Sequence, residues 1–575
     1  MQVLQFKKAN CKNCYKCVRH CPVKAIEVKD HQARILDEEC ILCGVCTIVC
    51  PQNAKEDVNE IPRVEELIAQ GRTVIATVAP SFSAAFEGSA FSALRAALLR
   101  LGFSDVRETA EGAYIVKTEY ERLLAENPER AIISTCCPTI VRYIERHRPE
   151  AIPLLAPVVS PMQASAQLIK KETPDAAVVF VGPCVSKKGE AGQSGGADFA
   201  VTFDELAGWL EQRGIAVEKV LESAARFSRM FPVTGGILDT MKKQKGISYA
   251  AVDGMQSCMD AIEELLSQNV KGCFVEMSSC KGSCVGGPAM RGRHAALSAR
   301  RAVETAAGDD PQVDFTAKER PLQQQYADRM KKRIRPSEAQ IREILRRMGK
   351  VSPEDELNCG SCGYATCREK AEAVFLGRAE VSMCLPFMKE RAESFSETII
   401  QATPNAIITV SSENLTVCQI NKAACELFGI GGERDILHAP VSRLFDDYDF
   451  VTMIAEEMPS LQKQTYLADY GLYLDQTFLY EEQNKLIICI MKDITGSKKA
   501  HDRSMKSKIS AANMADDIVE KQLRIVHEIA SLLGETAAET KLAVAQLKQT
   551  ILEEENEQAG EAFSQTAFKS AKGGM

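Results

Sequence analysis

The stretches CKNCYKCVRHCP, residues 11–22, and CILCGVCTIVCP, residues 40–51, decide the fold of the first part of the chain. Each places three cysteines at intervals of three residues and ends with a fourth cysteine and a proline. One pattern therefore occurs twice, which indicates an internal duplication. A tight loop can bring three thiolates to one side of a metal cluster, so a fourth ligand has to approach from another part of the chain.

This spacing is typical of bacterial two-cluster [4Fe-4S] proteins, in which the fourth cysteine of each run binds the other cluster. We therefore expect a two-cluster ferredoxin domain over residues 1–56. Zinc is the alternative metal, but zinc sites rarely take three cysteines within seven residues. The expected ligands are Cys11, Cys14, Cys17 and Cys50 for one cluster, and Cys40, Cys43, Cys46 and Cys21 for the other.

Composition limits the class of protein. A chain of 575 residues, 45% hydrophobic and 26% charged, is too long for one core, so we expect several domains. The net charge of −8 gives no broad basic surface, so nucleic acid is not an expected partner. The sequence shows neither the apolar core of a signal peptide nor an apolar stretch of membrane-spanning length. We therefore expect a cytoplasmic protein without membrane insertion, whose 22 cysteines mainly bind metal.

From about residue 57 to 300, short runs of β-branched residues alternate with longer helical patterns, which predicts an α/β fold. The clearest strand candidates are Val74–Val78, Ala131–Ser134, Ala177–Val181 and Gly272–Val275. Each is followed directly by a loop that contains proline, glycine or cysteine. Loops held by a rigid sheet often carry the chemistry of a protein, so we expect the functional site there.

Four of these loops resemble the catalytic domain of the [FeFe]-hydrogenases. The motifs are STCCP at Ser134–Pro138, PCVSKKGE at Pro183–Glu190, EMSSCKGSCVGGP at Glu276–Pro288 and VAPS at Val78–Ser81. The resemblance covers roughly residues 60 to 300, and its motifs occur in the family's order behind a ferredoxin domain. It implies reversible oxidation of H2 and reduction of protons.

The resemblance also implies a cofactor and its ligands. The H-cluster of this family joins a [4Fe-4S] cubane to a two-iron unit that carries CO and cyanide. One thiolate, here Cys284, would bridge the two parts. The cubane ligands implied by the resemblance are Cys137, Cys184, Cys280 and Cys284.

Further positions match residues that hold the two-iron unit or move protons. A buried Lys187 would face a cyanide, although a lone lysine is more often a solvated charge. Cys136 would relay a proton, although it also reads as a small buried apolar residue. The expected binding positions for the two-iron unit are Ala79, Pro80, Ser81, Pro183 and Lys187.

The chain departs from the efficient members of the family. Gly182 and Ser278 stand where those members have methionines, and the sensory branch of the family shares such replacements. We therefore expect slow turnover. Acidic residues of the proton path are expected upstream of Cys136, near Glu119 and Glu121, but the register of that helix is not fixed by the sequence.

A four-cysteine motif follows a charged helical segment. Cys359, Cys362, Cys367 and Cys384 resemble a short [4Fe-4S] domain found in several redox proteins, with a zinc knuckle as the alternative. The glycines beside the cysteines favour iron, because backbone amides can then approach sulfide. We expect this domain to relay electrons on the far side of the hydrogen-reactive site.

The next hundred residues resemble a PAS domain, with a helix at Asn421–Phe428 and a closing Asp493-Ile494-Thr495. From Ser504 to about Asn556 no proline occurs, which predicts an amphipathic helix that could form a coiled coil. His438 reads as a surface residue rather than a haem ligand. His527 faintly resembles the phosphoacceptor of histidine kinases, but a surface histidine is the simpler interpretation.

The expected fold class is therefore multidomain α/β. The expected domains are a two-cluster ferredoxin domain (1–56), a catalytic α/β domain (57–305), a helical connector (306–345), a four-cysteine [4Fe-4S] domain (346–392), a PAS α+β domain (393–497) and an amphipathic helix or coiled coil with a tail (498–575).

The expected function is a slow [FeFe]-hydrogenase that senses H2 or redox state and reports through the PAS domain. The alternatives are an ordinary ferredoxin-linked hydrogenase and a non-catalytic iron-sulfur scaffold. Expected partners are H2 and protons, a redox donor or acceptor such as ferredoxin, a second copy of the chain, and a signalling kinase or phosphatase.

Overall fold

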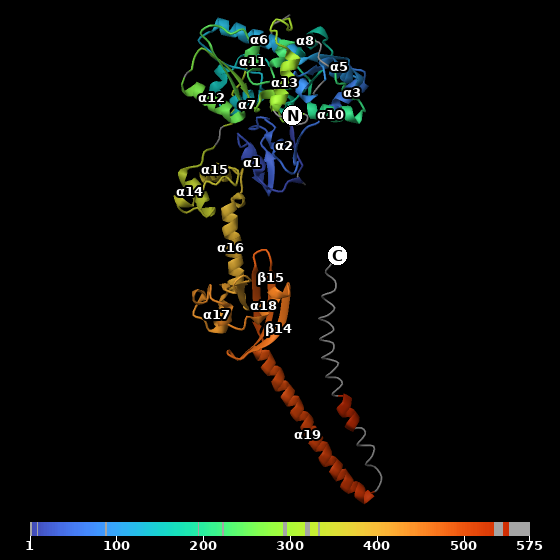
Figure 1. Cartoon of the computed structure of the whole chain (residues 1–575), viewed down its shortest axis with the longest axis vertical. Helices are drawn as coiled ribbons and strands as arrows, with labels where there is room; N and C mark the ends of the chain where they lie inside the picture. The colour runs from blue at the N-terminus through green and yellow to red at the C-terminus, as the bar shows by residue number, and fades with distance from the viewer. Residues whose placement is uncertain are drawn as a thin grey trace. The chain divides into compact units, whose positions relative to one another are not determined.

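The computed structural model describes the chain except residues 1–2, 8–9, 87–88, 194, 221–223, 269, 291–295, 317–322, 332–333, 534–543 and 551–575. The chain divides into two compact units, Met1–Glu390 and Arg391–Met575 (Figure 1). Of the helices in the described ranges, none has the length and apolar character needed to span a lipid bilayer.

The first unit begins with the duplicated cysteine domain. Each half contributes a cysteine loop that runs into a short helix, and the halves are joined by antiparallel strand pairs, β1 with β4 and β2 with β3. The elements are β1 (Leu4–Phe6), α1 (Lys16–His20), β2 (Ile26–Lys29), β3 (Gln32–Ile35), α2 (Val45–Ile48) and β4 (Lys55–Asp57).

Two parallel sheets form the centre of the α/β domain. One has the order β6-β5-β8-β9 and the other β10-β11-β7. Strands β5, β8 and β11 are buried at every position, as strands covered by helices on both faces are. The strands are β5 (Val74–Val78), β6 (Asp105–Glu108), β7 (Ala131–Ile133), β8 (Ala177–Gly182), β9 (Phe199–Thr202), β10 (Ser248–Asp253) and β11 (Cys273–Ser278).

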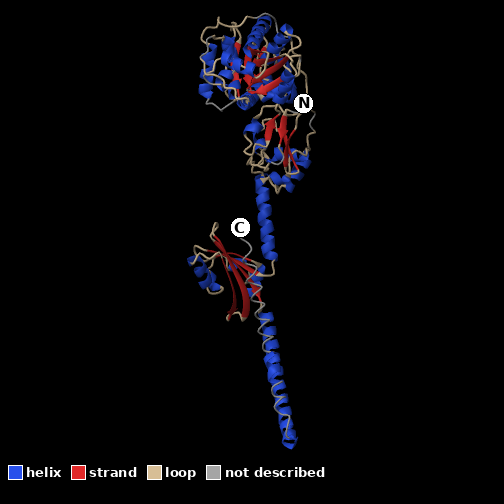
Figure 2. Cartoon of the chain, turned by 90° about the vertical axis from the view of Figure 1, so that its right-hand side faces the viewer, coloured by secondary structure: helices blue, strands red, loops and turns tan. Residues whose placement is uncertain are grey.

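Helices enclose these sheets (Figure 2). Gly112 on α6 lets that helix pack closely on α8, because a Cβ atom at this position would lie 2.2 Å from the backbone oxygen of Pro161. The helices are α3 (Ile61–Ala69), α4 (Phe82–Ala85), α5 (Phe91–Arg100), α6 (Thr109–Glu126), α7 (Pro138–His147), α8 (Pro161–Glu172), α9 (Val185–Lys188), α10 (Phe203–Gln212), α11 (Gly236–Thr240), α12 (Met255–Ser267) and α13 (Ala296–Ala307).

The four-cysteine domain packs on the ferredoxin domain. Lys24 donates to the carbonyl of Gly363 at 2.8 Å, and the Arg378 guanidinium pairs with the buried Glu39. Tyr364 shares one apolar core with Val18. The prediction that this domain lies on the far side of the hydrogen-reactive site is therefore wrong, since its apolar partners belong to the ferredoxin fold. Its helices are α14 (Glu338–Arg347), α15 (Cys367–Phe375) and the start of α16 (Leu385–Ala402).

The second unit is built on a five-stranded antiparallel sheet of order β13-β12-β16-β15-β14. Buried Asn421 caps α17 and donates to the carbonyls of Ile400 and Asn405, which fixes the entry to the sheet. His438 is exposed, as expected. The elements are β12 (Ala406–Ser411), β13 (Val417–Ile420), α17 (Lys422–Phe428), α18 (Tyr448–Ala455), β14 (Ser460–Leu467), β15 (Leu472–Glu481) and β16 (Leu486–Asp493).

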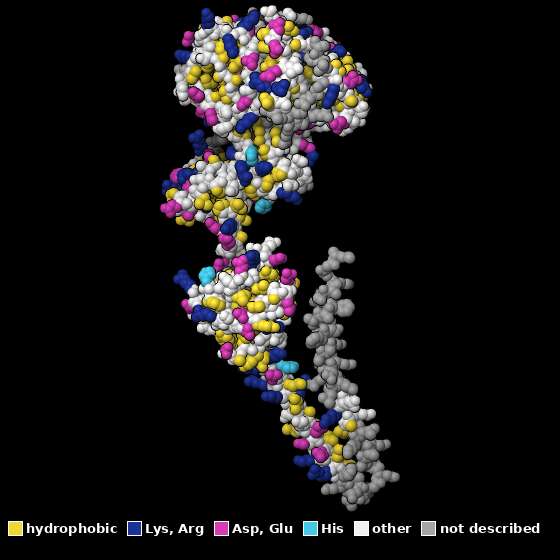
Figure 3. Space-filling model, viewed as in Figure 1, with side chains coloured by type: hydrophobic (Ala, Val, Ile, Leu, Met, Phe, Trp, Pro, Cys, Tyr) yellow, Lys and Arg dark blue, Asp and Glu magenta, His cyan; other side chains and the backbone are white. Residues whose placement is uncertain are grey.

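The sheet is followed by α19 (Thr495–Leu533), along which apolar and charged side chains alternate (Figure 3). Lys548 contacts Asp516 at 2.6 Å, whereas 32 residues of straight helix would separate them by about 48 Å. A single straight helix that includes both residues is therefore wrong. Residues 534–543 and 551–556 of the predicted helix lie outside the described residues. The side chain of His527 lies outside the described residues.

Candidate metal centre

The carboxyl ends of strands β5, β7, β8 and β11 face one cavity of about 100 Å³. The loops that follow these strands carry the four motifs singled out in the sequence, which is where parallel sheets place their functional residues. The predicted residues brought to this cavity are Ala79, Pro80, Ser81, Cys136, Cys137, Pro183, Cys184, Lys187, Ser278, Cys280 and Cys284.

The four predicted ligand thiols reach the cavity from different loops. Cys137 and Cys184 are the N-cap residues of α7 and α9. Cys280 follows β11. Cys284 lies on the 3₁₀ turn Ser283–Gly286, and its exposed side chain lines the cavity. Four sites separated by up to about 150 residues of sequence are thus gathered by the fold, and not by one local motif.

These thiols are poor anions without a metal. Burial raises the pKa of Cys184 to about 11 and that of Cys284 to about 12, and the charge of neighbouring thiols adds to both shifts. Burial also raises the pKa of Cys280 well above its usual range. Thiolates are the metal-binding form of cysteine. A bound cluster of metal cations would therefore stabilise the deprotonated form of these four thiols. The donor chemistry therefore fits an iron-sulfur cluster.

Two polar groups on the cavity wall fit an anionic partner. Ser81 Oγ is buried and has no hydrogen-bond partner among the described residues. Lys187 Nζ donates to Glu190 Oε2 at 2.6 Å and to Ser160 Oγ at 2.8 Å. Burial opposes the charge on Lys187, but the carboxylate of Glu190 outweighs it and the net pKa is raised. Lys187 is therefore a buried cation at the cavity.

The backbone at Ala79, Pro80 and Pro183 offers no free amide hydrogen to the cavity. The Ala79 amide donates to the carbonyl of Val181 at 2.8 Å and so belongs to the sheet. Pro80 and Pro183 line the cavity but, as prolines, have no amide hydrogen to donate. Ser81 and Lys187 are therefore the polar side chains of the predicted set that face the cavity.

The two positions that differ from efficient family members also lie here. A Cβ atom at Gly182 would stand 2.5 Å from Cζ of Phe180, so the phenyl ring occupies the space beside this glycine. Ser278 Oγ shares a 2.9 Å hydrogen bond with Ser283 Oγ. A phenyl ring and a serine pair therefore form this part of the wall.

Cys136 is accompanied by a tyrosine that sequence reasoning missed. Tyr120 OH lies 3.4 Å from Cys136 Sγ and accepts a 2.9 Å hydrogen bond from the Thr135 amide. Burial raises the pKa of the Cys136 thiol to about 12. Glu119 instead pairs with Arg122, and Glu121 accepts from the Lys242 amide at 2.7 Å. We expected an acidic side chain upstream of Cys136 to contact it. The residue that does so is Tyr120, which lies between Glu119 and Glu121 in the sequence.

Glu276, the first residue of its motif, holds a neighbouring turn. Its carboxyl oxygens accept from the amides of Gly235, Ile237 and Leu238 at 2.9, 3.0 and 3.2 Å. Burial raises its pKa to about 7, despite these three hydrogen bonds. This residue therefore fixes the start of α11 near the cavity wall.

The duplication of the ferredoxin domain is visible in its hydrogen bonds. The amide of Ala25 donates to Cys21 Sγ and the amide of Ala54 donates to Cys50 Sγ, each at 3.3 Å. Cys21 and Cys50 are the fourth cysteines of the two runs. Such amide-to-sulfur bonds tune the potentials of iron-sulfur clusters, so the geometry fits the predicted cluster pair.

The four-cysteine domain also gathers its thiols. Cys359, Cys362, Cys367 and Cys384 line a small apolar cavity together with Lys370 and Tyr364. Burial lowers the pKa of Lys370 to about 8. In the described part of the chain, no three Cys, His, Asp or Glu side chains converge tightly enough to hold a single metal ion.

Four segments match family models. Residues 72–288 match the iron only hydrogenase large subunit, C-terminal domain, so the resemblance noted in the sequence is confirmed. The other matches are a 4Fe-4S dicluster domain (4–62), a putative Fe-S cluster domain (355–386) and a PAS domain (394–464). The expected multidomain fold with ferredoxin-like, hydrogenase-like and PAS domains is confirmed as well.

The chain is distantly similar to characterised hydrogenases. It is 24% identical over 337 residues to the NADP-reducing hydrogenase subunit HndD of Solidesulfovibrio fructosivorans, which is 46% of this chain and 58% of that protein. It is 26% identical over 371 residues to the periplasmic [Fe] hydrogenase large subunit of Nitratidesulfovibrio vulgaris, which is 51% and 88%. The chain thus spans little more than half the length of the first of these relatives.

Two further similarities complete the comparison. The cytosolic Fe-S cluster assembly factor NAR1 of Encephalitozoon cuniculi is 25% identical over 228 residues, 34% of this chain and 62% of that protein. A variant of the [FeFe]-hydrogenase HydA1 from Chlamydomonas reinhardtii aligns with a TM-score of 0.38 at 16% identity, covering 48% of this chain and all of that one.

Proposed function

We propose that this chain oxidises H2 and reduces protons reversibly at an H-cluster, slowly, and uses the reaction to sense H2 or redox state. The observation that carries the proposal is one cavity where the thiols of Cys137, Cys184, Cys280 and Cys284 meet the unpartnered Ser81 hydroxyl and the buried Lys187 side chain. When bound there, the two-iron unit would supply the iron at which H2 is formed or split.

Each residue of the cavity has a proposed part. Cys137, Cys184, Cys280 and Cys284 would hold the cubane, and Cys284 would also bind the two-iron unit. Ser81 and Lys187 donate to cyanide ligands, because a hydroxyl and an ammonium stabilise an anion in a buried site. Cys136 carries the proton on Sγ, where its high pKa favours the protonated form.

Slow turnover follows from the wall around the cavity. In place of two thioethers the chain has the Phe180 ring beside Gly182 and the Ser278–Ser283 hydroxyl pair. Changes in the shell around a metal alter its potential and geometry. We therefore propose that the site serves sensing and turns over H2 slowly.

Electrons leave through the clusters of the first unit. The four-cysteine domain docks on the ferredoxin domain, with Cys362 and Cys21 in one packed cluster of side chains. We therefore propose that a third [4Fe-4S] cluster exchanges electrons with the ferredoxin pair. The PAS domain and α19 would form a homodimer and report to a signalling kinase or phosphatase, while ferredoxin is the proposed soluble redox partner. We propose the cytoplasm as the compartment, where thiols remain reduced.

A non-catalytic scaffold is the second candidate. The similarity to NAR1 cluster assembly factors supports it, because that similarity covers part of the same region. In this alternative the cavity would hold a cubane without the two-iron unit. The third candidate function is that of a ferredoxin-linked hydrogenase in which the unit Arg391–Met575 only mediates dimerisation.

Infrared spectroscopy distinguishes a hydrogenase from a non-catalytic scaffold. Protein produced with hydrogenase maturation factors should show the CO and cyanide stretching bands of the two-iron unit and evolve H2 at a measurable but low rate. A Cys284→Ala variant is the matched control and should lose these bands while keeping the ferredoxin signals. Absence of the bands from wild-type protein would refute the hydrogenase proposal and leave the scaffold.

A further inference from the structure

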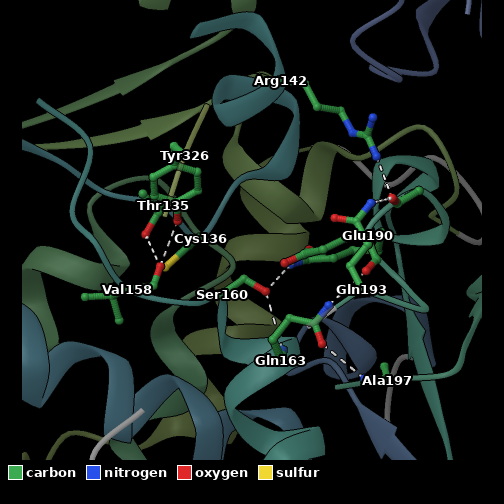
Figure 4. Close-up of polar contacts among 12 residues, drawn as sticks. Thr135, Cys136, Arg142, Val158, Ser160, Gln163, Glu190, Gln193, Ala197 and Tyr326 are labelled. Carbon is green, nitrogen blue, oxygen red and sulfur yellow. Dashed lines mark hydrogen bonds and ion pairs between the residues drawn. The ribbon is translucent and has the colours of Figure 1, made fainter. Parts of the chain in front are cut away.

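A second cavity, of about 70 Å³, lies next to the cluster cavity and shares Pro138 with its lining. Figure 4 shows several of its polar residues, among them Thr135, Arg142 and Tyr326. Its wall is polar and includes Arg142, Glu145, Gln163 and Tyr326. Apart from Thr135 and Glu190, its polar lining lies outside the four sequence motifs, so the metal centre does not explain it. A cavity of this size and polarity can hold hydrogen-bonded water.

A chain of hydroxyl groups connects this cavity with Cys136. Tyr326 OH and Thr135 Oγ1 both donate to the carbonyl of Val158, at 2.9 and 2.8 Å, and so lie side by side. Thr135 Oγ1 is 3.1 Å from Tyr120 OH, which is 3.4 Å from Cys136 Sγ. Tyr326 also forms a side-chain hydrogen bond with Thr135, so the hydroxyls of Tyr326, Thr135 and Tyr120 form a connected series from the cavity to the Cys136 thiol. Figure 4 shows Tyr326, Thr135 and Cys136 of this series.

We propose that protons reach Cys136 from the second cavity along the hydroxyls of Tyr326, Thr135 and Tyr120. The proposal deepens the proposed function and rests on it. For H2 formation, Cys136 gives up its proton, Tyr120 replaces it, Thr135 resupplies Tyr120, and Tyr326 resupplies Thr135. Cavity water resupplies Tyr326. Each hydroxyl gains and loses one proton, so one proton moves inward and every group ends neutral. For H2 oxidation the transfers run outward.

The physical environment suits transfer through neutral groups. Burial raises the pKa of Tyr120 and that of Tyr326, so neither phenol holds a lasting negative charge at neutral pH. Each group can still pass a proton while it accepts another, because hydroxyls are both donors and acceptors. The path therefore needs no buried carboxylate between Cys136 and the cavity.

The outer end of the path reaches solvent beside Glu145. This carboxylate lines the cavity and accepts from the amide of Ala327 at 3.1 Å, which holds the segment that carries Tyr326. Its other oxygen lies 3.6 Å from Nε of the exposed Arg329. Glu145 is buried and holds the segment that carries Tyr326, while the neighbouring Arg329 is exposed, so we place the entry of protons from bulk water at Arg329.

The test is hydrogen-deuterium exchange of the Cys136 thiol in protein that carries its cubane clusters but lacks the two-iron unit. The S–H stretching band of Cys136 is identified by difference against Cys136→Ala. After dilution into D2O, Tyr326→Phe should slow the loss of this band by roughly tenfold or more. Tyr470→Phe is the matched control, because Tyr470 OH also donates to a backbone carbonyl, that of Leu444 at 3.0 Å.

A second pair of variants separates the path from a general loss of structure. Thr135→Val should slow the exchange, while Thr135→Ser, which keeps the hydroxyl, should retain the wild-type rate. Unchanged exchange in both Tyr326→Phe and Thr135→Val would overturn the path. So would equal slowing in the serine and valine variants. Since this readout needs no two-iron unit, missing CO and cyanide bands would refute the hydrogenase proposal without altering the exchange result.

Discussion

Tyr120 OH lies 3.4 Å from Sγ of Cys136, and no carboxylate takes this place among the described residues. The contact joins helix α6 to the loop after β7. The thiol of Cys136 therefore has a hydroxyl group, that of Tyr120, within hydrogen-bonding distance.

Replacing Cys136 by Ala tests its role in turnover. We expect H2 evolution to fall by roughly 10²- to 10⁴-fold, because a positioned proton donor is lost. The CO and cyanide bands should remain, since Cys136 is not a proposed ligand. Cys273→Ala, which removes another buried thiol from the domain, is the control and should keep its rate. An unchanged rate in Cys136→Ala would remove the relay from the mechanism.

Lys187 is expected to hold the two-iron unit. Removing it alone would leave Glu190 unpaired at a cost of about 3–5 kcal/mol, so Lys187→Met is combined with Glu190→Gln. The double variant should fold and keep its cubanes but lose or shift the cyanide bands. Lys188→Met combined with Glu205→Gln provides the comparison, because Lys188 is also buried and pairs with Glu205 as well as Asp57. If this second double variant shifts the cyanide bands by the same amount, the assignment of Lys187 fails.

Gly182 and Phe180 are expected to behave as a pair. Gly182→Met places a side chain against the phenyl ring and should lower the unfolding free energy by about 1–3 kcal/mol through overpacking. Adding Phe180→Leu should restore stability, because it frees space for the thioether. Thermal unfolding of the single and double variants measures this coupling. Additive losses would show that the ring does not fill the space beside Gly182.

Glu276 should titrate near neutral pH. Its folded pKa of about 7 exceeds the ordinary value, so its contribution to stability is full below about pH 4.5 and is lost as the pH rises through about 7. Infrared difference spectra should show a carboxylic C=O band at pH 6 that disappears by pH 8.5. Glu276→Gln should lack this band at both pH values. A band that persists in the Gln variant belongs to another group.

The docking of the four-cysteine domain predicts magnetic coupling between clusters. Reduced wild-type protein should give an EPR spectrum broadened by interaction of the third cluster with the ferredoxin pair. Cys362→Ala should remove one cluster's iron and narrow the remaining signals. Lys24→Met, which breaks the bond to Gly363, should weaken the coupling while keeping all the iron. Sharp, independent signals in wild-type protein would contradict the proposed electron path.

Much of the central fold could be predicted from sequence. Val74–Val78 forms β5 over the predicted range, because a short apolar run between turn residues has few alternatives. Strand β14 was missed, since its residues Ser460–Leu467 are half-buried at best and carry no apolar signal.

Residues that belong to a sequence motif could be predicted at the site. Residues that reach it only through the packing of helices could not. The four cysteines at the cavity follow from the resemblance noted in the sequence, whereas the placement of Tyr120 depends on the rotation of α6. Glu119 and Glu121, named from sequence, flank it on either side. A helix turns by about 100° per residue, so an error of one position directs a side chain elsewhere. The docking of Tyr364 on Val18 has no sequence signal, because it depends on the shapes of two folded surfaces.

The high pKa values of the cavity thiols also bear on the life of the protein before its metal arrives. A thiol that stays protonated reacts slowly with oxidants. In the folded protein, burial raises the pKa of Cys184 to about 11 and that of Cys284 to about 12, so both thiols would stay mostly protonated before the metal binds. The apoprotein is thus suited to waiting, in a form that resists damage, for the machinery that completes it.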